Sequence, residues 1–82
     1  MTQATTTPAS PAVEVDGAAV RELRKQLGDT ISALAPRVPM SIGFLSQIER
    51  GTRTRVSPPK FKALAAALGI ADNPDAIKRS AA

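Results

Sequence analysis

The fold is decided by the stretch from Gly28 to Gly51, GDTISALAPRVPMSIGFLSQIERG. Two short segments with apolar residues at helical spacing flank a turn. On a helical wheel of the second segment, Ser41, Leu45 and Ile48 fall together and are expected to face the core. The opposite side of that helix collects Gly43, Ser46, Gln47 and Arg50. The second segment is therefore predicted to pack with one face and to offer a small polar face to a partner.

Capping residues and apolar spacing predict the remaining helices. Asp16 is a suitable N-cap and Gly28 a helix terminator, Thr30 can cap the next segment, and Ser57 is followed by a proline at the first helical position. No stretch alternates as a strand would. The predicted fold class is all-α, a compact four- to five-helix bundle that contains a helix-turn-helix. The expected helices span 17–27, 31–38, 42–50, 58–68 and 74–79.

Two prolines disturb the predicted helix 31–38 and the turn after it. Pro36 lacks the N–H that would bond to the carbonyl of Ser32, so this helix is expected to be kinked, shortened or partly 3₁₀. Pro39 cannot adopt a positive φ. The turn before the polar-faced helix is therefore predicted to be remodelled.

Length and composition exclude several classes of function. The 82 residues suit one small domain, which we place at 15–80, after a Thr-, Ala- and Pro-rich tail at 1–14 that is expected to be disordered. Histidine and cysteine are absent, so disulfides, thiolate nucleophiles and zinc-finger ligands are excluded. No metal, no cofactor and no catalytic residue is predicted. Without a long apolar run or signal peptide, the protein is expected to be cytoplasmic and not membrane-bound.

Positive charge is concentrated in the middle of the chain. The net charge is +4, and residues 21–62 hold nine basic residues against three acids. Such a patch suits a polyanion, although a solvated charged surface remains the plainer alternative. Five of these cations lie in a window that has no acid: Arg50, Arg53, Arg55, Lys60 and Lys62.

The residue types on the polar face suit a major groove of DNA. Gln47 can bond to adenine N6 and N7, Ser46 is a weaker reader, Gly43 allows close approach, and Ile42 can touch a thymine methyl group. Ordinary solvent exposure would explain the same polar residues, and Ile42 could simply cover the rim of the core. Phosphate contacts are predicted for a second set, namely Thr30, Arg50, Arg53, Arg55 and Lys60.

About 50 residues, 21–70, resemble the phage-repressor/Cro-type helix-turn-helix family, also called Xre-type. The resemblance is carried by RELRK at 21–25, LSQIERG at 45–51 and LAAALGI at 64–70. It implies a lambda-repressor-like five-helix fold in which the second and third helices form the reading motif. It also implies base contacts by Ile42, Gly43, Ser46 and Gln47. Ile31 and Ile42 depart from the family, which commonly has polar residues there.

The resemblance implies a sequence-specific transcriptional regulator that binds double-stranded DNA. It would be a small repressor or Cro-like switch protein, and the Ala- and Arg-rich composition suggests a GC-rich actinobacterium or its phage. Family members mostly bind pseudo-palindromic operators as dimers, so a homodimer is expected, with a monomer left open. The alternative is a protein-interaction module on the same scaffold, such as an antitoxin or transcription adaptor, because Ile31 and Ile42 are apolar.

Overall fold

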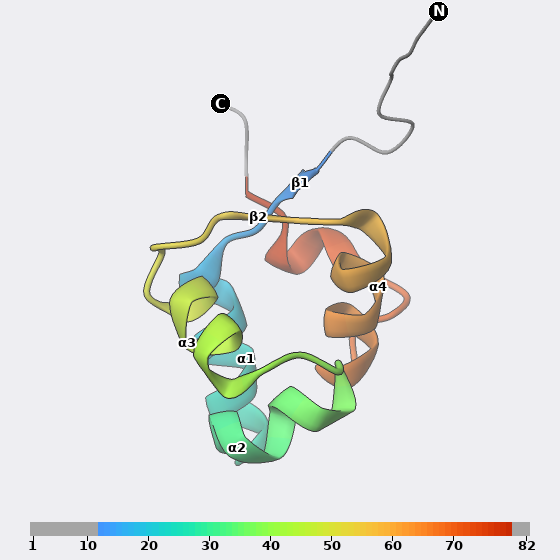
Figure 1. Cartoon of the computed structure of the whole chain (residues 1–82). Coiled ribbons are helices and arrows are strands. Elements are labelled where there is room, and N and C mark those ends of the chain that lie inside the picture. The colour runs from blue at the N-terminus through green and yellow to red at the C-terminus, as the bar shows by residue number, and fades with distance from the viewer. Residues whose placement is uncertain (1–11, 80–82) are drawn as a thin grey trace, which may run out of the picture.

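Short helices arranged around one core make up most of the structure (Figure 1), which is a computed structural model describing residues 12–79. The predicted all-α, helix-turn-helix class is confirmed, with the addition of a pair of very short strands. The elements are β1 (Val13–Glu14), α1 (Gly17–Leu27), α2 (Ile31–Leu34), the 3₁₀ helix η1 (Ala35–Arg37), α3 (Ile42–Glu49), β2 (Arg55–Val56), α4 (Pro58–Ala67) and the 3₁₀ helix η2 (Pro74–Ile77).

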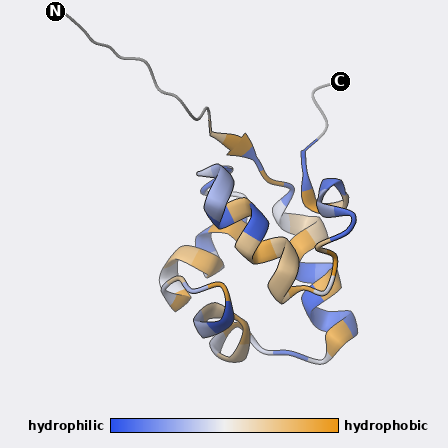
Figure 2. Ribbon diagram, turned by 90° about the vertical axis from the view of Figure 1, so that its right-hand side faces the viewer, coloured by the Kyte–Doolittle hydropathy of each residue, from blue (hydrophilic) through white to orange (hydrophobic). Residues whose placement is uncertain are grey.

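Every helix contributes apolar side chains to a single core. In Figure 2 hydrophobic and hydrophilic residues are interspersed along the helices, as expected where each helix has one buried and one outer face. Burial of these side chains is the main stabilising contribution in so small a domain. The largest fully buried side chains are Val15, Val20, Leu34, Val38, Leu45, Ile48, Leu64 and Ile77.

The ends of α1 are formed by the residues that the sequence predicts. The side chain of Asp16 accepts hydrogen bonds from the backbone N–H groups of Ala18, at 3.1 Å, and Ala19, at 3.3 Å. Gly28 adopts φ 76°, a left-handed conformation that costs glycine little. The predicted boundaries of this helix are confirmed.

Pro36 shortens the second helix, as predicted. The α-helical part ends at Leu34, and the chain continues as η1, which contains Pro36 at a position where no N–H is needed. The turn after η1 includes a cis Val38–Pro39 peptide bond. Leu34, Ala35 and Val38 are all buried, so the expected inward face of this segment is confirmed.

The prediction that the chain has no strand is wrong. β1 pairs antiparallel with β2, with Val13 opposite Val56 and Glu14 opposite Arg55. On its other side, the Glu14 carbonyl accepts a hydrogen bond from the N–H of Arg79 at 2.9 Å. Two-residue strands are too short to show an alternating pattern, so only the long-range pairing defines them.

The strand pair also changes the N-terminal boundary. Val13 and Glu14, which the sequence analysis assigned to the tail, belong to the folded domain because they form β1. Residues 1–11 of the predicted tail lie outside the described residues, as does residue 80 at the predicted end of the domain. The last predicted helix, 74–79, is the shorter 3₁₀ helix η2, because Lys78 is extended and the N–H of Arg79 bonds to Glu14 of β1.

Candidate nucleic-acid interface

The inner and outer faces of α3 are as predicted, except at its first turn. Leu45 and Ile48 are fully buried, whereas Ile42 is 53 % exposed. Ser41 is exposed rather than inward-facing, because its Oγ caps the helix and accepts a hydrogen bond from the N–H of Phe44 at 3.0 Å. A hydroxyl placed at an N-cap must stay near the free N–H groups and cannot also enter the core.

The predicted reading residues form a continuous strip on the outer face. Ile42, Gly43 and Arg50 are exposed, and Ser46 and Gln47 are half-buried. A Cβ added to Gly43 would meet no atom within 4 Å, so the backbone is open to close approach there. The structure thus brings all four predicted base-reading residues together on one side of a single helix.

The loop that follows α3 folds back on the end of this helix. Gly51 has φ 78°, a backbone conformation that reverses the chain and that glycine adopts readily. The N–H groups of Thr52 and Arg53 then both donate to the Gln47 carbonyl, at 3.0 and 3.1 Å. As a result, the side chain of Arg53 lies against the outer strip of α3.

Arg53 contacts two side chains of α3. Its guanidinium carbon lies 4.6 Å from the centre of the Phe44 ring, and its Nε donates to Gln47 Oε1 at 3.3 Å. A guanidinium stacked on an aromatic face is attracted by the electron-rich ring. Arg53 is therefore part of the outer strip of α3, and the sequence alone does not indicate either contact.

Three other predicted phosphate-binding residues lie on different elements, and their side chains already form hydrogen bonds within the protein. Arg55 lies in β2, where its Nε donates to Glu14 Oε2 at 2.7 Å, and this hydrogen bond lowers the pKa of Glu14. Lys60, at the start of α4, donates to the carbonyl of Pro39 in the turn before α3. Thr30 is exposed and caps α2, accepting from the N–H of Ala33 at 3.1 Å.

A buried ion pair that sequence reasoning missed supports the interface. Arg24 Nε and Nη2 donate to Glu49 Oε2 and Oε1 at 2.7 and 2.9 Å, and this bonding raises the pKa of Arg24. The side chains are only 14 % and 4 % exposed. The sequence signal that could have indicated this pair is helical spacing. Arg24 lies four residues after the buried Val20, and Glu49 lies four residues after the buried Leu45, so each charged residue shares a helix face with a core residue.

A surface hollow of about 690 Å³ lies beside this pair, where α1, the start of α2 and α3 meet. Within residues 12–79, neither Arg21 nor Arg50 forms an ion pair, so both guanidinium groups are available to an anion. Arg21 was not among the predicted site residues. The hollow is lined by Arg21, Arg24, Ile31, Ser46, Glu49 and Arg50.

Comparison with known proteins agrees with this architecture. A family model described as a helix-turn-helix domain matches residues 17–76, which is most of the chain. The protein therefore belongs to the helix-turn-helix family, and the predicted relationship to its Xre-type members is confirmed. No curated protein sequence matches the chain.

One similar solved structure is the crystal structure of SinR, the master regulator for biofilm formation, in complex with DNA. The two chains share 27 % sequence identity and superpose with a TM-score of 0.64. The similarity covers 71 % of this chain and 94 % of the SinR chain. SinR is thus a structural relative whose own complex contains DNA.

Two further findings concern the described residues alone. Among residues 12–79, no group of three or more acidic, histidine or cysteine side chains is placed to hold a metal ion. In the same part of the chain, no helix is both long and apolar enough to cross a membrane.

Proposed function

We propose that this protein is a DNA-binding transcription regulator that reads the major groove with α3. The observation that carries the proposal is the composition of the outer face of α3, where small and polar side chains lie over a buried Leu45 and Ile48. Membership of the helix-turn-helix family and the similarity to a DNA-bound regulator support it. The family is one of regulators and not of enzymes, so we assign no catalytic residue.

The proposed base-reading residues are Ile42, Gly43, Ser46 and Gln47. Gln47 has the amide that can make paired hydrogen bonds to a purine, and Ile42 offers an exposed apolar surface suited to a thymine methyl group. Gly43 leaves the backbone open, and Ser46 is a hydroxyl that can donate or accept. These contacts would supply sequence specificity.

The proposed phosphate contacts surround the reading strip. Thr30 caps α2 next to Ile31, which lines the hollow, while Arg50 lines the hollow itself and Lys60 lies beside the turn that leads into α3. Arg21 joins this set, because its guanidinium lines the same hollow. Arg55 is assigned a smaller contribution, since the ion pair with Glu14 partly offsets its charge.

Repression by occupancy is the regulatory mode that we propose. The described residues form one helix-turn-helix domain, and a domain that occupies an operator blocks other proteins from it without any further activity. A homodimer on a pseudo-palindromic operator fits the family pattern, in which two half-sites lie about one helical turn apart.

Selection of bound sequences from random duplex DNA, followed by salt titration, tests the proposal. We expect a single preferred sequence, palindromic for a dimer, and an affinity that falls about 100-fold between roughly 50 and 200 mM salt, because several phosphates are neutralised. Gln47→Ala should abolish the preference at one base pair, while the control Arg50→Ala should weaken binding to all sequences. An affinity that does not change with salt would contradict DNA binding.

A protein-interaction module remains the second candidate, favoured by one specific observation. Ile42 and Leu27 are the two large hydrophobic side chains most exposed among residues 12–79, at 53 % and 50 %. In that case the wild type would bind no DNA at moderate salt, and Ile42→Ser would abolish binding to a protein partner. Under the DNA-reading proposal, Ile42→Ser instead alters base preference.

A further inference from the structure

Arg53 contacts both Gln47 and Phe44 in a way that bears on how Gln47 reads a base. Arg53 was expected to bind phosphate, which requires only its charge. The structure instead shows its backbone N–H bonded to the Gln47 carbonyl, its Nε bonded to Gln47 Oε1, and its guanidinium on the Phe44 ring. Three contacts therefore join one loop arginine to one turn of α3.

The chemistry of the contact determines the orientation of the Gln47 amide. A guanidinium carries only hydrogen-bond donors, so the amide atom that faces Arg53 must be the oxygen. The Nε2 amine is left to donate to another acceptor, and the oxygen keeps a second lone pair. Without Arg53, the terminal amide would rotate freely between two opposite orientations.

Phe44 fixes the position of Arg53. The Phe44 ring is half-buried and packs against the hydrophobic core, so it is a rigid platform. The guanidinium lies on this platform while the loop backbone is anchored to the Gln47 carbonyl. An arginine held at both its backbone and its side chain loses little further freedom when DNA binds.

We infer that Arg53 is a positioning residue for base reading: held by Phe44, it orients the amide of Gln47 so that the Nε2 amine donates to a purine in the major groove. The inference rests on the proposed function, because it concerns the same face of α3. It changes the expected role of Arg53 from general affinity to discrimination at one base pair. The remaining guanidinium N–H groups are still able to bind phosphate.

The test measures dissociation constants for the selected duplex and for duplexes changed at single base pairs. The base pair read by Gln47 is the one at which Gln47→Ala loses its preference. At that base pair we expect the ratio of dissociation constants for the changed and the selected duplex to be on the order of 10-fold in wild type. In Arg53→Ala and in Phe44→Leu the ratio should be only about twofold. The double variant Gln47→Ala/Arg53→Ala should discriminate no less than Gln47→Ala alone. The matched control Arg50→Ala, whose cation has no bond to Gln47, should weaken all duplexes and keep the ratio.

Nuclear magnetic resonance of the free protein provides a readout that needs no DNA. The side-chain amide signals of Gln47 should shift in Arg53→Ala and in Phe44→Leu, and should stay in place in Arg50→Ala. Unchanged signals in Arg53→Ala, or a base ratio that Arg53→Ala leaves intact, overturn the inference alone. A wild-type protein that selects no sequence overturns the proposed function and the base-reading role together.

Discussion

Gly17 lies where the start of α1 passes the end of α3. A Cβ built on Gly17 would be 1.9 Å from the carbonyl oxygen of Ile48 and 2.9 Å from its carbon. Both neighbours are backbone atoms, which cannot rotate away as a side chain could. At the scale of a single residue, the absence of a side chain at position 17 therefore sets how closely α3 approaches α1.

Gly17→Ala is expected to destabilise the protein by about 1–3 kcal/mol, because α1 and α3 must move apart. Gly43→Ala is the matched control, since a Cβ there meets no atom within 4 Å. In a helix, alanine is more stable than glycine by roughly 0.5–1 kcal/mol, so this variant should not lose stability. Urea denaturation of both variants measures the difference. Equal free energies of unfolding for the two would contradict the close approach seen here.

The pair of Arg24 and Glu49 is the main polar connection between the elements α1 and α3. Arg24 also donates from Nη1 to the carbonyl of Asp29 at 2.9 Å, so one side chain ties α1 to the end of α3 and to the chain before α2. Such a pair contributes little when compared with well-packed apolar residues, but breaking it leaves a buried charge without a partner. The contribution of this pair is therefore to fix the orientation of α3 relative to α1.

Arg24→Leu is expected to destabilise the protein by about 3 kcal/mol, because Glu49 is left buried and unpaired. Arg21→Leu, one turn earlier and exposed, should change the free energy of unfolding by no more than roughly 0.5 kcal/mol. The double variant Arg24→Leu/Glu49→Leu should recover most of the loss. Thermal and urea unfolding provide the values, and a double variant no more stable than Arg24→Leu alone would refute this account.

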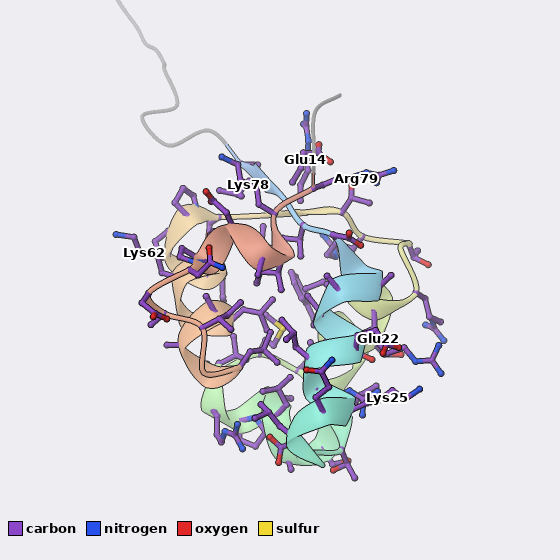
Figure 3. All side chains as sticks on the ribbon, turned by 180° about the vertical axis from the view of Figure 1, so that it is seen from behind. Glu14, Glu22, Lys25, Lys62, Lys78 and Arg79 are labelled. Atoms are coloured by element: carbon purple, nitrogen blue, oxygen red, sulfur yellow. The ribbon has the colours of Figure 1, made fainter. Side chains whose placement is uncertain are left out.

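At the scale of the whole molecule, the N-terminal strand β1 connects the C-terminal end of the folded domain to β2 in the middle of the chain. Its residues pair with β2 on one side, and its Glu14 carbonyl accepts a hydrogen bond from the N–H of Arg79, after η2, on the other. Figure 3 shows Glu14, Lys78 and Arg79 gathered at this end of the molecule. The ion pair of Arg55 with Glu14 lies across the β1–β2 ladder and adds an electrostatic contribution there.

This end of the molecule predicts a pH dependence of stability. The hydrogen bond from Arg55 lowers the pKa of Glu14 below its ordinary value of 4.5, so the pair stabilises the folded state above that pH and loses its effect as the pH falls below it. The stability advantage of wild type over Glu14→Gln should therefore shrink as the pH falls below 4.5. The exposed pair is screened by salt, so urea denaturation is best done at low ionic strength. An advantage that stays constant down to pH 3 would show that the carboxylate charge contributes nothing.

The sequence by itself determined both ends of α1, the start of α2 and the buried stripe of α3. Asp16, Gly28 and Thr30 act within one turn of their own helix, and the stripe of Leu45 and Ile48 follows from helical periodicity. The outer face of α3, which includes the half-buried Ser46 and Gln47, follows from the same periodicity. The shortening of α2 at Pro36 was predictable because a missing N–H is a local property.

Only the tertiary structure decided which distant groups meet. Arg24 and Glu49 are 25 residues apart, and Glu14 and Arg55 are 41 apart. The close approach of Gly17 to Ile48 and the contact of Arg53 with Phe44 also depend on how chain segments cross or fold back. Periodicity and capping describe one element at a time, whereas these contacts are set by the packing of the core, which brings together residues that the local pattern does not relate.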